Sequence, residues 1–285
     1  MKTPRMLRLP GAGIELQAAD WSGQGEPILA VHGMTANCRS FDLVARALAP
    51  THRFLAVDLR GRGLSDKPDT GYSVDLHCQD LESALTELGL SRVTLMGHSL
   101  GAYICLALAG RRPDLARGLI LLDGGAPLSQ AQWDRIELGI KASFARLGKP
   151  FPSFEDYIAP FKAAPFLQPW SKFLEDYFRY ESVEREGEIW SRTDPDHIAQ
   201  DVAGLRVLDP TGLYPKVACP VLILRATEGL VSPEDLVLPE QPTQEMIQAL
   251  DRAEKVDLAG TNHYSIALQP NPERDRVILE FLAEL

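Results

Sequence analysis

The chain has 285 residues, of which 45% are hydrophobic and 24% are charged, a composition typical of a soluble globular protein with a sizeable core. Its formal net charge of −10 argues against the clustered Lys and Arg side chains that bind a phosphate backbone, so we expect no nucleic-acid partner. The length fits one large α/β domain or a core that carries an inserted subdomain.

The N-terminal segment carries charge but has no apolar run of signal-peptide length, and no later segment reaches bilayer-spanning length without a charge. We therefore expect a cytoplasmic protein with no membrane span. The four cysteines are widely scattered and form no C-x-x-C pair, and the six histidines lack the spacing of metal ligands. This pattern predicts reduced thiols, no metal and no cofactor.

Short apolar runs alternate with helical patterns through the first half of the chain. Residues 13–18 alternate in the manner of an antiparallel edge strand. Continuous apolar strands with helices between them indicate a mostly parallel sheet with helices on both faces, and so an α/β fold. The strands are expected at 27–31, 54–57, 93–97 and 118–122, and the helices at 41–48, 74–88 and 102–108.

A Gly-x-Ser-x-Gly motif centred on Ser99 joins the strand at 93–97 to the helix at 102–108. This context is that of a nucleophile elbow, a strained turn that exposes the serine hydroxyl. Gly97 and Gly101 carry no side chains that would collide where the strand folds back on the helix. We therefore predict that Ser99 is a catalytic nucleophile.

The alternation stops after Gly125, and residues 126–215 show helix-like segments broken by prolines, with no convincing strand. This stretch contains 14 of the chain's 21 aromatic residues, which favours a segment with its own apolar contacts. We interpret residues 126–215 as a helical cap inserted into a core formed by residues 1–125 and 216–285. The core strands and closing helix that follow are expected at 220–224, 255–258 and 272–285.

Two further motifs join the elbow in a resemblance to the α/β-hydrolase family that covers nearly the whole chain. The run His-Gly-Met-Thr at 32–35 follows the strand at 27–31, where the family places half of its oxyanion hole. Residues 58–68 resemble the family's turn after the next strand. The resemblance implies the α/β-hydrolase fold, whose cap usually enters after the sixth strand, as the aromatic insertion does here.

The resemblance also implies the partners of the serine. The backbone N–H groups of Met34 and Leu100 would form the oxyanion hole, and His263, in the loop after the last strand, would take the serine proton. His32 resembles the family's structural loop histidine. His98 is expected to pack against neighbouring loops, because adjacent side chains at a sharp turn point apart.

Three other histidines look like ordinary surface positions. They are His52, His77 and His197.

The acid that would orient His263 is missing from its usual place. Most members of the family carry it after the seventh strand, and that pattern, laid on residues 220–233, puts Gly229 where the aspartate stands. Some members carry the acid at the end of the sixth strand, where this chain has Asp123. We therefore predict a Ser99–His263–Asp123 triad, with Glu228, one residue from the usual position, as the alternative acid.

A serine nucleophile with a histidine base implies an acyl-enzyme that forms and is then hydrolysed. The predicted activity is hydrolysis of a small or medium-sized, hydrophobic carboxylic ester or lactone by a monomer or homodimer. Family members that cleave C–C bonds also use serine, so this activity stays open. A non-catalytic, hydrolase-like binding protein is the alternative from another class, and the retained serine, histidine and oxyanion positions argue against it.

Overall fold

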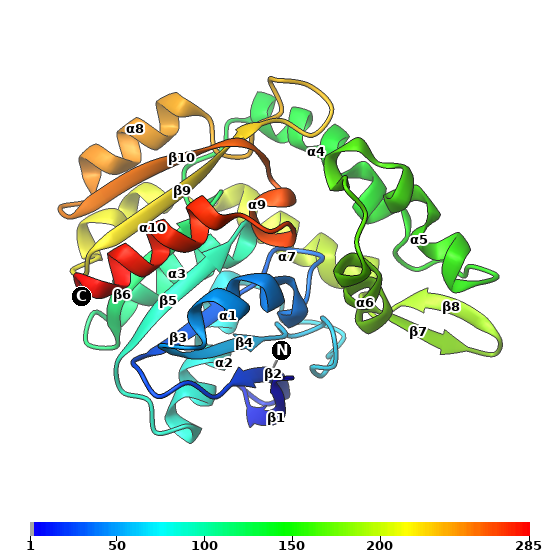
Figure 1. Cartoon of the computed structure of the whole chain (residues 1–285), viewed down its shortest axis with the longest axis horizontal. Coiled ribbons are helices and arrows are strands. Elements are labelled where there is room, and N and C mark those ends of the chain that lie inside the picture. Colours follow the sequence, from blue (N-terminus) through cyan, green and yellow to red (C-terminus); the bar gives the residue numbers. More distant parts are fainter. Residues whose placement is uncertain (1–2) are drawn as a thin grey trace.

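The computed structural model describes residues 3–285, so the first two residues of the predicted core segment 1–125 lie outside the described residues. A central sheet runs through the molecule (Figure 1). Its strands are β1 (Arg5–Pro10), β2 (Glu15–Trp21), β3 (Pro27–Val31), β4 (Arg53–Val57), β5 (Val93–His98), β6 (Ala116–Leu122), β9 (Val221–Glu228) and β10 (Ala253–Asn262). Their order is β1-β2-β4-β3-β5-β6-β9-β10.

The sheet is parallel from β4 to β10, whereas β2 pairs antiparallel with both of its neighbours, β1 and β4. The prediction of an α/β fold with a mostly parallel sheet is confirmed. The prediction of an antiparallel strand at residues 13–18 agrees with β2, but the predicted edge position is wrong, because β2 lies between β1 and β4. The true edge, β1, carries Arg5 and Arg8 and is largely exposed, so its sequence lacks the apolar run of a buried strand.

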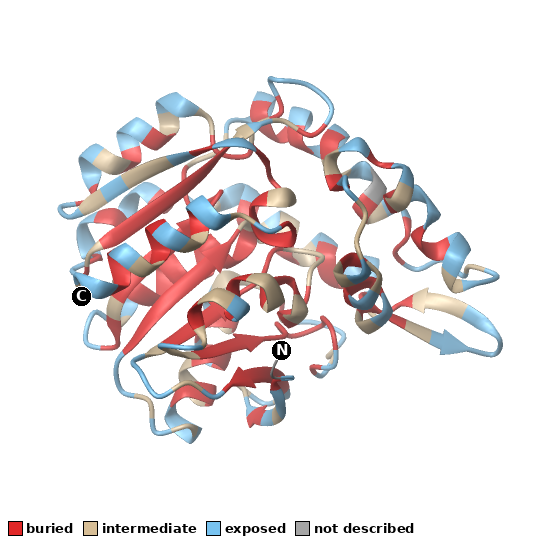
Figure 2. Ribbon diagram, in the orientation of Figure 1, coloured by how far each residue is buried: buried red, intermediate tan, exposed pale blue. Residues whose placement is uncertain are grey.

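Helices cover both faces of the sheet because successive strand side chains point to opposite faces. They include α1 (Asp42–Leu48), α2 (Val74–Glu87), α3 (Leu100–Arg111) and α10 (Pro272–Ala283). On β3, Ile28 and Ala30 belong to the apolar cluster that contains α1 and α10. Leu29 and Val31 belong to the cluster that contains α2 and α3. Figure 2 shows the central strands buried between these two layers.

Shorter elements complete the core. They are the 3-10 helix η1 (Cys38–Phe41) and the helices α8 (Glu240–Ala249) and α9 (Ser265–Leu268). The sequence did not predict α8, whose mostly polar residues bury only Thr243 and Met246. In residues 3–285, no helix combines the length and apolarity needed to cross a bilayer.

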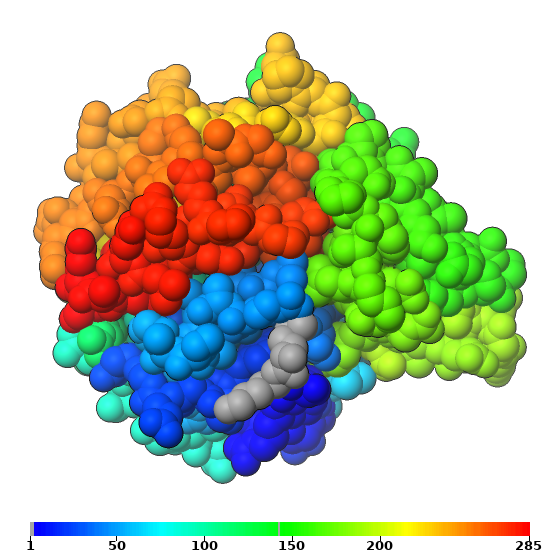
Figure 3. Space-filling view, in the orientation of Figure 1, coloured from blue at the N-terminus to red at the C-terminus, as the bar shows by residue number. Residues whose placement is uncertain are grey.

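Residues 126–215 are here called the insertion, and most of them form a lobe beside the core, green to yellow-green in Figure 3. A cluster of buried aromatic and aliphatic side chains, among them Tyr157, Phe161 and Phe178, gives the lobe its own packing. Its helices are α4 (Gln130–Ala145), α5 (Phe154–Ala163), α6 (Lys172–Glu181) and α7 (Pro195–Val207), with short 3-10 turns η2 (Pro165–Leu167), η3 (Pro210–Gly212) and η4 (Tyr214–Lys216).

The insertion also contains a β-hairpin, so the prediction of no strand there is wrong. Its strands are β7 (Ser182–Arg185) and β8 (Glu188–Ser191), paired antiparallel. Glu186 and Gly187 both have positive φ, as the two central residues of a tight type I′ hairpin turn require. The hairpin's charged residues conceal the apolar alternation on which strand prediction depends.

Candidate active site

Ser99 lies between the last residue of β5 and the first residue of α3, in the conformation predicted for an elbow. Its φ of 55° and ψ of −121° place a non-glycine residue in strained backbone. Its N–H donates to the carbonyl of Leu122 (3.1 Å), and its carbonyl accepts from Ala102 (2.9 Å). The turn is thus fixed to both β6 and α3, and the serine hydroxyl is left half-buried.

Both glycines of the elbow motif are needed for close backbone contact. A Cβ added at Gly97 would lie 2.1 Å from the carbonyl oxygen of Gly101. One added at Gly101 would lie 2.0 Å from the carbonyl oxygen of Val31, on the neighbouring strand. No side chain fits at such distances, so this motif packs strand, turn and helix closer than other residues allow.

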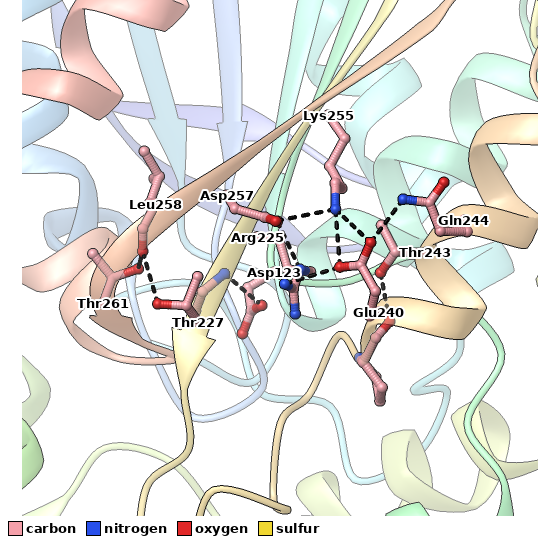
Figure 4. Close-up of polar contacts among 12 residues, drawn as sticks. Asp123, Arg225, Thr227, Glu240, Thr243, Gln244, Lys255, Asp257, Leu258 and Thr261 are labelled. Carbon is pink, nitrogen blue, oxygen red and sulfur yellow. Dashed lines mark hydrogen bonds and ion pairs between the residues drawn. The ribbon is translucent and has the colours of Figure 1, made fainter.

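His263 and Asp123 meet Ser99 at the carboxyl end of the sheet. His263 Nε2 lies 3.0 Å from Ser99 Oγ, and its Nδ1 lies 2.7 Å from Asp123 Oδ2. Asp123 is almost fully buried, and its other carboxylate oxygen accepts from the N–H of Ala226 (3.1 Å). Figure 4 shows Asp123 beside the C-terminal end of β9, next to ion pairs that join Arg225 to its neighbours. The three predicted side chains therefore form one hydrogen-bonded line.

The alternative acid, Glu228, lies elsewhere. Its side chain is exposed at the end of β9, and the contact with His263 Nδ1 is made by Asp123. At Gly229, a Cβ would lie 2.0 Å from Asp235 Oδ1 and 1.8 Å from the carbonyl oxygen of Ser232. The usual position of the acid is thus closed to any side chain.

Asp235, which sequence reasoning missed, organises the loop after β9. Its carboxylate accepts from three consecutive backbone N–H groups, those of Leu230 (2.6 Å), Val231 (2.9 Å) and Ser232 (3.3 Å). A buried carboxylate that accepts backbone N–H groups replaces the solvation it loses. The loop is therefore built around a structural acid in the space where other chains would place a catalytic one.

The predicted oxyanion hole has two backbone N–H groups beside Ser99. Leu100 N–H is the first amide of α3, where the helix dipole favours negative charge. Within the described residues, neither this amide nor that of Met34 donates to a protein acceptor. A Cβ at Gly33 would lie 3.1 Å from Ser99 Cβ, so the glycine brings the loop close to the serine.

Two buried histidines hold the loops around Ser99. His32 donates from Nδ1 to the carbonyl of Gly33 (2.7 Å), while its Nε2 accepts from Leu59 N–H (3.0 Å). His98 donates from Nε2 to the carbonyl of His263 (2.8 Å), which is the loop packing expected of it. Burial lowers the pKa of both His32 and His98 to about 3, so both rings are neutral.

The prediction that His77 and His197 are surface positions is wrong. His77 is fully buried on α2, and its Nε2 lies 3.0 Å from Asp201 Oδ1 on α7. His197 is buried on α7 and stacks on Tyr72 with ring centroids 4.4 Å apart. Both are buried because α7 packs on the core, a contact that local sequence does not reveal. His52 is half-buried beside Thr51.

A cavity of about 440 Å³ reaches Ser99 and His263. Its walls come largely from apolar side chains of the insertion. They include Trp133, Ile136, Phe161, Phe178, Ile198 and Leu205. Apolar walls of this kind with a few polar groups are typical of a small-molecule site.

Among the buried lining residues, Arg146 is the charged side chain, and its charge is neutralised. Its guanidinium lies 3.2 Å from Glu181 Oε1 and donates to Tyr157 Oη (3.1 Å) and to the carbonyl of Thr35 (3.1 Å). Glu181 also accepts from the hydroxyls of Tyr157 and Ser191. The cavity wall therefore contains a satisfied ion pair, with no unpaired cation at this position.

No cluster of three or more His, Cys, Asp or Glu side chains suited to a metal occurs among residues 3–285, and the absence of metal and cofactor remains a prediction. The four cysteines are free and buried.

Comparisons with known proteins were made on sequence and on structure. A family model described as alpha/beta hydrolase fold matches residues 26–267. The chain is 30% identical over 203 residues to 2-(acetamidomethylene)succinate hydrolase of Mesorhizobium japonicum, which is 71% of each chain. It is 32% identical over 167 residues to cis-3-alkyl-4-alkyloxetan-2-one decarboxylase of Shewanella oneidensis, 55% of this chain and 51% of that one. The solved structure of E-2-(acetamidomethylene)succinate hydrolase matches with a TM-score of 0.83 at 25% identity, over 98% of this chain and 99% of that one.

Proposed function

The chain belongs to the α/β-hydrolase family, and on that premise we propose that it is a serine hydrolase of uncharged carboxylic esters or lactones. The observation that carries the proposal is the line from Ser99 Oγ through His263 to Asp123, at the end of an apolar cavity. A hydroxyl, an imidazole and a buried carboxylate in this order are the parts that acyl transfer requires.

The distances support a two-step reaction. His263 Nε2 takes the proton from Ser99 Oγ, 3.0 Å away, as the oxygen attacks the substrate carbonyl carbon. Asp123 holds the Nδ1–H of His263 and stabilises the imidazolium that forms. His263 then gives its proton to the leaving alkoxide, which breaks the C–O bond and leaves the acyl group on Ser99. Water, deprotonated by His263, attacks the acyl-enzyme and releases the acid.

The charge on the tetrahedral intermediate is met by backbone amides. Met34 N–H and Leu100 N–H donate to the oxygen anion. In serine hydrolases, loss of one such donor raises the activation free energy by about 3 to 4 kcal/mol. Since the donors are main-chain groups, the half-buried side chain of Met34 serves instead as part of the cavity wall.

The cavity supports a substrate without charge. Its buried guanidinium, Arg146, is paired with Glu181. The other two charged lining residues are exposed: Glu137 is paired with Arg206, and Lys141 is a solvated cation. An anionic acyl group would lose its water without gaining an unpaired buried cation. Ser40 Oγ is buried at the cavity, with no hydrogen-bond partner in residues 3–285, and is available to the substrate's ester or ether oxygen.

The insertion acts as a cap in this proposal, because its side chains supply most of the apolar lining. The domain division is then a core of residues 1–125 and 216–285 and a cap of residues 126–215. A cytoplasmic location belongs to the same proposal, and the four free, buried cysteines fit a reducing compartment.

A second candidate comes from the relative that acts on 2-(acetamidomethylene)succinate. That substrate is a dicarboxylate, so the second candidate function is hydrolysis of an anionic substrate of this kind. The TM-score of 0.83 over 98% of the chain favours it. Cleavage of a C–C bond by the same serine also remains a candidate, since it requires the same nucleophile and base. The neutralised Arg146 favours the uncharged ester or lactone.

Pre-steady-state kinetics with p-nitrophenyl esters test the proposal. We expect a burst of p-nitrophenol equal to the enzyme concentration, followed by slower turnover that S99A lacks. Neutral p-nitrophenyl butyrate should be preferred to the p-nitrophenyl monoester of succinate. Preference for the succinate monoester, or turnover of 2-(acetamidomethylene)succinate in its place, would shift the assignment to the second candidate. If there is no burst and no turnover of esters, lactones or a C–C substrate, the result would favour the alternative of a non-catalytic binding protein.

A further inference from the structure

Three consecutive carbonyl oxygens of the oxyanion loop, here residues 33–36, are held by cationic or imidazole side chains. Gly33 O accepts from His32, and Met34 O accepts from Arg62 Nε at 3.0 Å. Thr35 O accepts from Arg146 Nη2 at 3.1 Å. The peptide planes on both sides of Met34 are thus fixed at their carbonyls. Because each peptide group is planar, this also fixes the direction in which Met34 N–H points.

Each of the two arginines is paired with a carboxylate of the insertion. Arg62, fully buried in the core, lies 2.5 Å from Asp201 Oδ2 on α7. Arg146, at the end of α4, lies 3.2 Å from Glu181 Oε1 at the end of α6. Both pairs are almost completely removed from water, so neither guanidinium keeps its place without the partner charge.

Asp201 is the link between α7 and the oxyanion loop. Its carboxylate is shared between Arg62 and His77 Nε2, which lies 3.0 Å away on α2. Burial raises the pKa of Asp201, but the charge of Arg62 and the contact with His77 outweigh it and lower the pKa to about 2. The carboxylate is therefore ionised at every pH at which the enzyme would work.

We propose that the Arg62–Asp201 and Arg146–Glu181 pairs are positioning devices through which the seated insertion holds Met34 N–H in the oxyanion hole. The inference rests on the proposed function, since it gives the hole a catalytic role. In this view, α7 and α6 do more than shape the cavity: the carboxylates they carry keep the oxyanion loop in its catalytic conformation. Arg62, Asp201, Arg146 and Glu181 act through the loop and touch no reacting atom.

The chain contains a matched control for this proposal. Arg60 and Asp80 form an ion pair at 2.7 Å that is buried as deeply as the Arg62–Asp201 pair. Arg60 donates to the carbonyls of Gly71 and Ala12, away from the oxyanion loop. D201N and D80N each leave a buried guanidinium without its anion. Arg62 also donates to the backbone carbonyl of Arg60 (3.0 Å), but only D201N removes the carboxylate that faces the guanidinium bound to Met34.

The experiment compares D201N, D80N and the wild-type protein with a p-nitrophenyl ester and two inhibitors. An alkylboronic acid bonds to Ser99 Oγ and places an oxygen anion in the hole, whereas an n-alkanol of equal length forms no adduct. We expect kcat of D201N to fall about tenfold to a hundredfold, less than the ~10²–10³ for loss of a whole donor, with little change in KM. The affinity for the boronic acid should fall in parallel, and that for the alkanol should not change. D80N should lose stability but keep its kcat and both affinities.

Equal kinetic losses in D201N and D80N, or an unchanged boronic acid affinity in D201N, would overturn the proposal. If D201N does not fold, R62K carries the same expectation, because its single ammonium lacks the planar fork that reaches both Met34 O and Asp201. A wild-type protein without turnover or boronic acid binding would refute the proposed function itself. If the wild-type protein is active but D201N and D80N show equal losses of kcat and of boronic acid affinity, only the positioning role is refuted.

Discussion

His98 donates a hydrogen bond from Nε2 to the backbone carbonyl of His263 at 2.8 Å, and their rings lie 4.7 Å apart. The residue that precedes Ser99 in the chain therefore fixes the backbone of the residue that contacts Ser99 in space. This bond holds together two segments that are more than 160 residues apart in the chain. It lies beside the contact between His263 Nε2 and Ser99 Oγ.

The two buried, neutral histidines predict that acid destabilises the protein. The pKa of His32 and of His98 is lowered to about 3 in the folded chain from an ordinary value of 6.5. Below pH 6.5 the unfolded chain binds protons at these rings and the folded chain does not. The free energy of unfolding should therefore decrease as the pH is lowered below 6.5, by about 1 kcal/mol per pH unit for each histidine.

Urea unfolding of the wild type and of H98N at pH 7.5, 6.5, 5.5 and 5.0 checks this. Because H98N retains only one of these two histidines, His32, its free energy of unfolding should fall less steeply as the pH is lowered from 6.5 to 5.0 than that of the wild type. H52N serves as the comparison: half-burial also lowers the pKa of His52, but less than full burial lowers that of His98, so H52N should flatten the slope less than H98N. Identical slopes for H98N and the wild type would show that His98 is charged in the folded protein at these pH values.

Substitution of Asp123 should separate the two candidate acids. D123N keeps the size of the side chain but removes the charge that orients His263, and the equivalent change in a serine protease lowers kcat by about 10⁴. E228Q alters an exposed side chain and should leave kcat unchanged. Steady-state kinetics on one p-nitrophenyl ester suffice. Near wild-type turnover in D123N together with a large loss in E228Q would reverse the assignment.

An acid at the usual family position should not rescue D123N. In D123N/G229D, the new Cβ would lie 2.0 Å from Asp235 Oδ1 and 1.8 Å from a backbone oxygen. The loop would have to rearrange, and two carboxylates would meet in a buried space. We expect the double variant to be no more active than D123N and less stable in thermal unfolding. Recovery of activity would mean that the loop after β9 adapts more easily than its hydrogen bonds to Asp235 suggest.

Glu181 should control the charge preference of the cavity. E181Q removes the carboxylate that holds Arg146 at the cavity wall, and the carboxylate of an anionic acyl group can then take its place as the partner of the guanidinium. We expect the ratio of kcat/KM for a succinate monoester to that for a butyrate ester to rise about tenfold, the equivalent of a single charge-assisted contact. Because both kcat/KM values are measured on the same variant, a general loss of activity cancels in their ratio. An unchanged ratio would show that Arg146 does not face the acyl group.

The elements nearest the proposed chemistry were the most predictable from sequence. The β3 strand begins and ends where its apolar run does, and the elbow follows from glycines that no other residue can replace. Asp123 was predicted as the acid because Gly229 leaves the usual position empty.

What the sequence did not reveal depends on long-range contact. Asp201 meets Arg62 only because α7 folds back on the core, and no local pattern marks either as half of a buried pair. The same contact buries His77, which the sequence analysis predicted to be an ordinary surface position. The helix α8 and the β7–β8 hairpin were missed because both are largely polar and bury few apolar side chains.

The most direct test of the account is the labelling of the protein with a fluorophosphonate, followed by peptide mass spectrometry. The reagent reacts with a serine that a histidine activates, and its oxygen occupies the oxyanion hole. We expect one label per chain, on Ser99, with esterase activity lost in proportion to labelling and no label on S99A or H263A. Full esterase activity in a protein completely labelled at Ser99, or a label that S99A still accepts, would contradict the account.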